Sequence, residues 1–254
     1  MTDAAVEILG VGKRYATGVE ALRDVSVSLP RGRLTTLLGP SGCGKTTLLK
    51  IVAGLIQPTA GEVRVDGRRV ESPGPERAFV FQDFALLPWA TVLRNVAFGL
   101  ELRGAPREAR EETARRWIAE VDLAGFEHSY PNQLSGGMRQ RVGLARALAV
   151  DAKIILMDEP FSAVDEQTRR KFQEDLLVLL RDRGKTVIFV THSIEEAVYL
   201  SDRIVLLTPR PGTVHRVVEP SVERGRRSPD EIRRDKGYLD AVDEIWQVLK
   251  QHVG

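Results

Sequence analysis

A glycine-rich loop carries the strongest chemical signal in this sequence. The residues from Gly39 to Thr46 fit the pattern G-x-x-x-x-G-K-[ST], in which backbone N–H groups turn inward around phosphate oxygens. In that pattern Lys45 adds a charge near the β and γ phosphates, and the hydroxyl of Thr46 faces Mg²⁺. A glycine-rich turn without a ligand is the alternative interpretation. The candidate phosphate-binding residues are Gly39, Pro40, Ser41, Gly42, Cys43, Gly44, Lys45, Thr46 and Thr47.

Two adjacent carboxylates at the end of an apolar run supply a second signal. The run Ile154–Asp158 predicts a buried strand with a carboxylate at its C-terminal end, which is where α/β sheets bind ligands. Because Mg²⁺ requires oxygen ligands, Asp158 is a candidate metal-side residue. Glu159 is placed to orient or deprotonate an attacking water. The alternative is that the pair caps the following helix.

The lone cysteine, Cys43, lies inside the glycine-rich loop. We expect the helix-end charge and Lys45 to favour its thiolate, so that thiol reagents block the site unless a nucleotide protects it. The alternative is that Cys43 is only a small residue filling a tight turn.

Short β-branched runs alternate with longer helical patterns along the chain, which is typical of an α/β sheet with crossover helices. Leu34–Leu38 reads as a buried strand that leads into the loop, and Lys45–Ala53 as the helix that follows it. Val6–Val11 and Leu22–Leu29 alternate with period two and predict antiparallel strands. Further strands are predicted at Glu62–Asp66, Ala78–Phe81, Thr186–Val190, Arg203–Leu207 and Thr213–Val217, and the strand that runs into Asp158 is predicted to begin at Lys153 and reach Met157.

The pattern between about Val92 and Ala149 changes to helix, as shown by the i+4 spacing of Thr113, Trp117 and Val121. We expect a helical insertion beside the sheet core. The main domain is predicted to cover residues 1–220, with residues 221–254 forming a charged linker and a C-terminal helix. An apolar stripe on that helix is expected to pack on its own domain, and it consists of Leu239, Val242, Ile245, Trp246 and Leu249.

Composition excludes several classes of protein. With 37 basic and 35 acidic residues the formal charge is +2, which is too even to indicate nucleic-acid binding. One cysteine excludes an intramolecular disulfide and favours a cytosolic setting. We expect no export signal at the start of the sequence and no apolar run of the roughly 18 residues that span a bilayer.

The segment Leu134–Arg141, with the sequence LSGGMRQR, resembles the signature motif of the ATP-binding cassette (ABC) ATPases. The resemblance implies a P-loop NTPase of the ABC type, in which a mixed core sheet is joined by an N-terminal antiparallel β subdomain and an α-helical subdomain. Ser135, Gly136 and Gly137 open a helix and form a second anion site. In this family two chains pair head to tail, and the signature of one closes on the ATP of the other. An ordinary helix start capped by Ser135 is the alternative.

The resemblance assigns roles to other residues in the order that the family requires. Tyr15 matches the aromatic residue that stacks on adenine, although a tyrosine that packs in a turn is the alternative. Gln82 matches the glutamine that reaches Mg²⁺ and the attacking water, and His192 matches the histidine on the γ phosphate. Asp165 ends the loop that crosses the dimer interface. The implied catalytic residues are Lys45, Gln82, Glu159 and His192, and the implied metal-side residues are Thr46, Gln82 and Asp158.

Two residues depart from the family's commonest pattern. Met138 stands where the signature usually has glutamine, and Val164 stands where the interface loop usually has leucine. Neither position carries the phosphate contacts, so the implied ATPase activity is unaffected.

Three stretches resemble ATPases of bacterial importers for nitrate, sulfonates and taurine: Leu86–Trp89, Arg94–Leu100 and Leu207–Gly212. This resemblance implies that ATP hydrolysis drives solute uptake. It also implies a peripheral position on the cytoplasmic face of the inner membrane, membrane permease subunits that dock at Gln82–Trp89, and a periplasmic solute-binding protein as an indirect partner. Two alternatives stay open: an importer for another solute, such as a pyrimidine thiamine precursor, and a soluble regulatory or scaffold ATPase.

Overall fold

The computed structural model describes residues 3–162, 166–181, 184–223 and 228–250. The chain divides into two compact units, one formed by residues 1–74 and 176–254 and the other by residues 75–175. Helix α5 (Glu166–Arg181) crosses the boundary between them in sequence.

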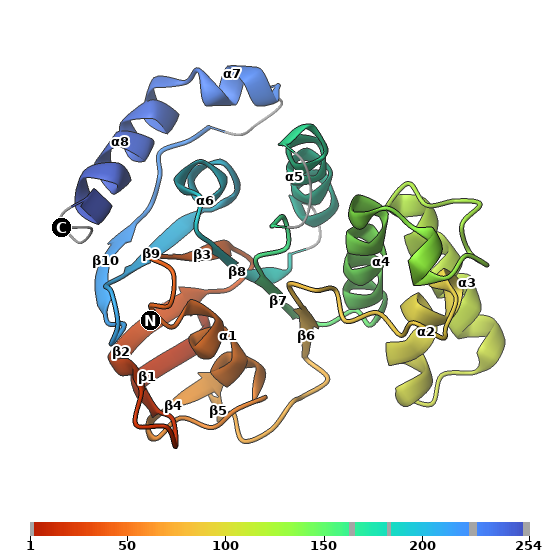
Figure 1. The fold of residues 1–254 in the computed structure, drawn as a ribbon, viewed down its shortest axis with the longest axis horizontal. Coiled ribbons are helices and arrows are strands. Elements are labelled where there is room, and N and C mark those ends of the chain that lie inside the picture. Colours follow the sequence, from red (N-terminus) through yellow and green to blue (C-terminus); the bar gives the residue numbers. More distant parts are fainter. Residues whose placement is uncertain (1–2, 163–165, 182–183, 224–227, 251–254) are drawn as a thin grey trace. The chain divides into compact units, whose positions relative to one another are not determined.

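The first unit contains two groups of strands (Figure 1). The elements of this unit are β1 (Ala4–Arg14), β2 (Glu20–Pro30), β3 (Leu34–Leu38), α1 (Lys45–Ala53), β4 (Ala60–Val65), β5 (Arg68–Arg69), β8 (Thr186–Thr191), α6 (Ile194–Leu200), β9 (Arg203–Leu207), β10 (Val214–Val218), α7 (Pro229–Arg233) and α8 (Lys236–Lys250).

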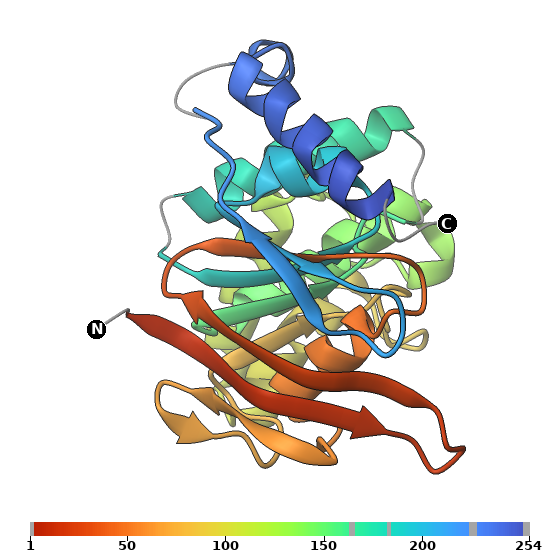
Figure 2. The same cartoon turned by 90° about the vertical axis from the view of Figure 1, so that its left-hand side faces the viewer.

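One group is the antiparallel sheet β2-β1-β4-β5, in which β1 and β2 form the long pair seen in Figure 2. The other group has the order β10-β9-β3-β8. There β9, β3 and β8 are parallel, and β10 pairs antiparallel to β9. The predicted antiparallel N-terminal strands and the mixed sheet are therefore both present.

Strands β3 and β8 are buried along their whole length, because parallel strands are covered on both faces by helices. Helix α1 covers one face and α6 the other (Figure 1). The register pairs Leu38 at the end of β3 with Thr191 at the end of β8. The loops that follow these two strands consequently leave the sheet side by side.

The C-terminal helix α8 packs on α6, and the Tyr238 hydroxyl donates to the Glu195 carbonyl at 3.5 Å. The buried face is rotated from the predicted stripe, because it consists of Tyr238, Ala241, Ile245 and Val248. Two stripe residues, Leu239 and Trp246, are 50% and 57% exposed, so the expectation that they pack on the domain is wrong.

Helix α7 lies within the segment that the sequence analysis predicted to be a charged linker. Ser228 caps this helix, and Glu231 completes a capping box, so the local signal was Ser228-Pro-Asp-Glu231.

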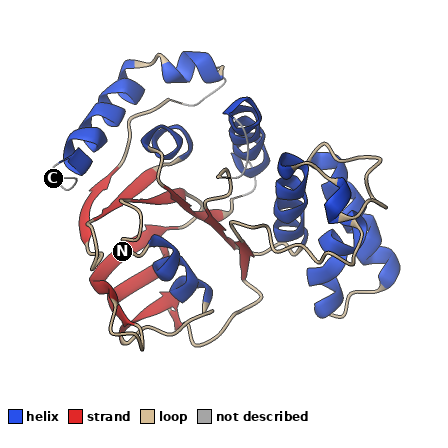
Figure 3. Cartoon of the chain, viewed as in Figure 1, coloured by secondary structure: helices blue, strands red, loops and turns tan. Residues whose placement is uncertain are grey.

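The second unit is mostly helical (Figure 3). Strands β6 (Arg77–Val80) and β7 (Ile154–Asp158) pair in parallel. Three helices pack together, α2 (Val92–Leu102), α3 (Arg107–Glu120) and α4 (Gly136–Ala149), and the short 3-10 helix η1 (Pro131–Gln133) precedes α4. Ala114, Trp117 and Ile118 form the buried face of α3. The predicted helical block is therefore confirmed.

Candidate phosphate-binding and catalytic site

The glycine-rich loop joins β3 to α1, the position that its pattern predicts. Gly42 and Gly44 have φ values of 76° and 103°, a region that favours glycine. A Cβ at Gly44 would lie 2.8 Å from the Ala21 carbonyl oxygen, and one at Gly39 would lie 2.8 Å from the Leu207 carbonyl oxygen. The neighbouring backbone therefore requires glycine at positions 39 and 44.

Lys45 is 5% exposed and turns back into its own loop. Its ammonium group donates to the Gly39 carbonyl at 2.7 Å and to the Pro40 carbonyl at 3.0 Å. Helix α1 has no side-chain cap and no acidic residue in its first turn, so the positive end of its dipole is not neutralised locally. A buried cation beside an uncompensated helix N-terminus fits a phosphate ligand.

Cys43 is 1% exposed, and burial raises the pKa of its thiol. The charge of Lys45, whose Nζ lies 4.0 Å from the Cys43 Sγ, lowers the pKa but does not outweigh burial. The expectation that this residue favours the thiolate is therefore wrong. Desolvation disfavours the charged form of an acid more strongly here than the nearby positive charge favours it.

Gly212 packs against the backbone of the phosphate loop at Cys43, a contact that the sequence analysis did not predict. A Cβ at Gly212 would lie 2.1 Å from the Cys43 carbonyl oxygen. The Gly212 N–H donates to the Ala21 carbonyl at 2.9 Å, and its carbonyl accepts from the Arg23 N–H at 3.0 Å. The available signal was the Pro-Gly pair at the end of Leu207–Gly212, which the sequence analysis used only to assign a subfamily.

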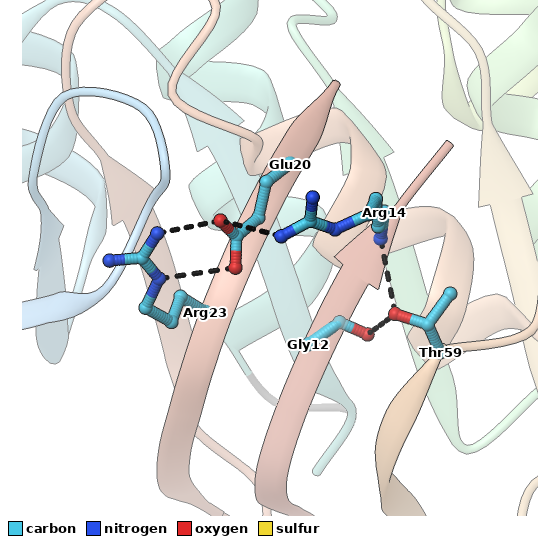
Figure 4. A network of polar contacts seen from close by, with 5 residues as sticks. All are labelled: Gly12, Arg14, Glu20, Arg23 and Thr59. Atoms are coloured by element: carbon cyan, nitrogen blue, oxygen red, sulfur yellow. Dashed lines mark hydrogen bonds and ion pairs between the residues drawn. The ribbon is translucent and has the colours of Figure 1, made fainter. Parts of the chain in front are cut away.

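Tyr15 lies just beyond β1, and its hydroxyl is 3.0 Å from the hydroxyl of Thr47 in α1. Its side chain is 39% exposed. A polar network fixes the strand ends on either side (Figure 4): Glu20 accepts from Arg23 at 2.6 and 3.1 Å and pairs with Arg14 at 3.3 Å. The structure therefore places an accessible aromatic ring beside the phosphate loop, as stacking on a base requires.

His192 is exposed and follows β8 directly. Its turn is fixed by the neighbours on either side, because the Thr191 hydroxyl accepts from the Ser193 N–H at 3.0 Å and donates to the Glu196 carboxylate at 2.5 Å. The register of β3 and β8 places this turn next to the phosphate loop. The first unit thus brings Tyr15, the loop and His192 to one region.

In the second unit Gln82 and Glu159 follow paired strands. The last pair in the register is Val80 with Met157, so both residues lie two positions beyond it. Asp158 is 5% exposed at the end of β7. Glu159 has a φ of 44°, which costs a non-glycine residue about 1–2 kcal/mol. Such strain is typical of functional positions.

Ser135 caps α4 by accepting the Met138 N–H at 3.2 Å, and Gly136 and Gly137 form the first residues of the helix. The Ser135 hydroxyl oxygen is therefore engaged as an ordinary helix cap, which was the alternative interpretation of this motif. The glycines still leave the helix N-terminus without bulky side chains, and a helix N-terminus attracts anions. Asp165 and Val164 lie outside the described residues.

The Gln82–Trp89 segment connects β6 to α2 and is held by Asn95, which the sequence analysis did not single out. Asn95 is 0% exposed. It accepts the Leu87 N–H at 2.8 Å and donates to the carbonyls of Ala90 at 3.0 Å and Thr91 at 3.1 Å. Trp89 is left 71% exposed.

Within the described part of the chain, no group of three or more histidine, cysteine or acidic side chains is arranged to hold a metal. This is compatible with the predicted set, in which Thr46 and Gln82 contribute a hydroxyl and an amide. The same residues include no helix that is long and apolar enough to cross a membrane.

Comparison with known proteins gives consistent matches. The family model described as ABC transporter matches residues 22–162. The taurine import ATP-binding protein TauB of Yersinia pestis is 53% identical over 256 residues, covering 96% of this chain and 99% of that protein. An uncharacterized ABC transporter ATP-binding protein of Methanocaldococcus jannaschii is 51% identical over 235 residues, covering 92% of this chain and 86% of the relative.

Among solved structures, a dimeric ATP-binding cassette in a post-hydrolysis state with ADP and Pi is similar to this chain. Its TM-score is 0.75 at 37% identity, and the match covers 84% of this chain and 98% of that one. The predicted cassette fold is confirmed by this likeness.

Proposed function

This chain belongs to the ABC transporter family, and we propose that it is the ATP-hydrolysing subunit of a solute importer. The observation that supports this function most directly is the phosphate loop. Lys45 is buried at the N-terminus of α1, where its charge and the free end of the helix favour a triphosphate. The signature residues and the Asp158-Glu159 pair occur in the same chain.

Some of the proposed site residues bind ATP, and others act in the cleavage of its terminal phosphate bond. Tyr15 stacks on the adenine, and the backbone of Gly39–Thr47 surrounds the phosphates. Lys45 stabilises charge on the β and γ phosphates. Thr46, Gln82 and Asp158 would hold Mg²⁺, which supplies charge neutralisation of the phosphate oxygens when bound. Glu159 accepts a proton from the attacking water, and His192 contacts the γ phosphate.

The site is completed by a second copy of the chain. We assign to Ser135, Gly136 and Gly137 an anion site that serves the ATP of the other copy. In a head-to-tail pair with two-fold symmetry, the signature of each chain closes on the ATP of the other. The dimeric state of the similar cassette structure supports this arrangement. Asp165 would lie at the interface between the copies.

The names of the relatives and the exposed Trp89 support a partnership with a membrane transporter. We assign the chain to the cytoplasmic face of the inner membrane, where permease subunits dock at Gln82–Trp89, and a periplasmic binding protein delivers the solute. The name of the TauB relative makes taurine the first substrate to test. Uptake of taurine, nitrate and a thiamine-precursor pyrimidine by the assembled importer distinguishes these solutes. Co-purification with a membrane subunit distinguishes an importer from a soluble switch.

The experiment that tests the catalytic assignment is Glu159→Gln in the purified chain. We expect hydrolysis to fall by about 100-fold or more, since a general base contributes that much. ATP-bound dimers should accumulate, measured by size-exclusion chromatography with light scattering. Glu112→Gln on the exposed side of α3 is the matched control and should hydrolyse ATP at the wild-type rate. Wild-type hydrolysis in Glu159→Gln would remove Glu159 as the base, and the absence of a dimer would contradict the two-chain site.

A further inference from the structure

The segment that follows Gln82 bends sharply. Phe84 and Ala85 have φ values of 62° and 42°, so two consecutive residues with side chains adopt the left-handed region. Such a conformation is unfavourable for L-residues and persists only where the surroundings enforce it. The bend is therefore held by contacts with other parts of the second unit.

Arg146 in α4 provides those contacts. One terminal nitrogen of its guanidinium donates to the Ala85 carbonyl at 2.7 Å, and the other donates to the Phe84 carbonyl at 2.6 Å. A planar fork of donors suits two adjacent carbonyls, and a lysine cannot reproduce that geometry. The two terminal nitrogens of Arg146 therefore match the two adjacent carbonyls of Phe84 and Ala85.

Partial burial strengthens these hydrogen bonds. Phe84 is 5% exposed, and a Cβ at Gly143 would lie 3.6 Å from its Cβ, so α4 packs closely on the bend. Desolvation lowers the pKa of Arg146, while the neighbouring Asp83 opposes that shift. A charged donor in a partly dry environment makes stronger hydrogen bonds than one in water.

Helix α4 is also the helix that Ser135 caps. Arg146 lies ten residues beyond Gly136, which is about 15 Å along the helix axis. The N-terminus of α4 and the backbone two residues after Gln82 are thus joined by one helix and one half-buried side chain.

We propose that Arg146 is a positioning residue that fixes Gln82 to the signature helix, so that Gln82 and the N-terminus of α4 move as one body. The proposal rests on the proposed function, because it requires Gln82 to act on the metal side of ATP. Arg146 does not touch ATP; it acts through the Phe84–Ala85 bend.

The test is a double-mutant cycle in the purified full-length chain, with Arg146→Met, Gln82→Ala and the double variant. We expect Arg146→Met to lower kcat by about 10- to 100-fold, the usual effect of losing a residue that orients a metal ligand. The KM for ATP should change less than about twofold, because the phosphate loop is untouched. The Mg²⁺ concentration giving half-maximal rate should rise in both single variants. The double variant should match Gln82→Ala, because Arg146 has nothing left to position.

Two further variants separate positioning from folding. Arg103→Met is the matched control, since Arg103 also donates to two backbone carbonyls in this unit, those of Val150 and Pro75, away from the bend. It should keep the wild-type kcat. Arg146→Lys keeps the positive charge, and its kcat should lie between those of the wild type and Arg146→Met. If Arg146→Met does not fold, Arg146→Lys replaces it in the cycle.

The outcomes that overturn the two claims differ. If the losses in Gln82→Ala and Arg146→Met multiply in the double variant, or if Arg103→Met is equally impaired, the positioning role of Arg146 is wrong. If Gln82→Ala keeps the wild-type kcat and the wild-type Mg²⁺ dependence, the metal-side role of Gln82 in the proposed function is wrong.

Discussion

The phosphate loop and the Gln82–Trp89 segment each follow a parallel strand, but different interactions hold them in shape. The phosphate loop is tied to itself, because Lys45 donates to the Gly39 and Pro40 carbonyls of the same loop, and neighbouring backbone encloses its glycines. The Gln82–Trp89 segment is fixed from outside, by Asn95 of α2 and Arg146 of α4. The first is therefore a preformed binding site, whereas the second takes its shape from the helices around it.

The largest expected effect tests how tightly the phosphate loop is enclosed. Gly44 and Gly42 both have positive φ, but only Gly44 lacks room for a side chain: a Cβ there would lie 2.6 Å from the Leu22 side chain, whereas nothing lies within 4 Å of one at Gly42. Gly44→Ala adds overpacking to backbone strain, about 3 kcal/mol or more, and should weaken nucleotide binding by at least about 100-fold. Gly42→Ala carries the strain alone and should weaken it by about tenfold.

Equilibrium titration with a fluorescent ATP analogue measures both affinities. Equal losses in the two variants would show that conformational strain, and not enclosure by the neighbouring backbone, governs this loop.

The second prediction concerns the outside support of the Gln82–Trp89 segment. Asn95→Ala removes the buried amide that pairs with Leu87, Ala90 and Thr91 and leaves the Leu87 N–H without its acceptor. We expect the free energy of unfolding to fall by about 3 kcal/mol, as for other broken buried networks. Asn132→Ala, at an exposed position of the same unit, should stay within about 0.5 kcal/mol of the wild type. Urea unfolding followed by circular dichroism measures both, and equal midpoints would contradict the role of Asn95.

The same contrast explains what the sequence could predict. The bounds predicted for β3, α1 and β9 match the structure, because a buried β-branched run and a glycine-flanked helix are local patterns. The order of Lys45, Ser135, Asp158 and His192 along the chain indicated the family for the same reason.

Non-local packing escaped prediction. Arg146 acts on carbonyls about 60 residues away in sequence, and Asn95 acts on backbone groups four to eight residues away across a loop. A backbone carbonyl or N–H leaves no sequence signal of its own. The face of α8 was misjudged because its apolar residues cover about half of the helix, and periodicity alone does not say which part of such an arc meets α6. The thiol of Cys43 was misjudged because the helix end and Lys45 are visible in the sequence, whereas burial is not.

The smallest expected effect concerns the reactivity of the Cys43 thiol. It tests whether burial or the nearby positive charge sets the pKa of this thiol inside the phosphate loop. Burial raises the pKa of Cys43, so below the raised pKa the residue is a neutral thiol, which reacts poorly with alkylating reagents. We expect iodoacetamide to modify Cys43 at about one tenth of the rate of an exposed cysteine at the same pH, with the rate rising as pH rises toward the raised pKa.

The matched control is the double variant Ser41→Cys/Cys43→Ala, which moves the thiol to an exposed position of the same loop. There the charge of Lys45 and the end of α1 remain nearby while the desolvation is gone, so its pKa should lie below that of Cys43. Rates from pH 6 to about 10, followed by mass spectrometry, give both profiles. Coincident profiles would mean that the positive charge, and not burial, controls the thiol, and the loop would then be more open to water than the enclosure of Gly44 and Lys45 implies.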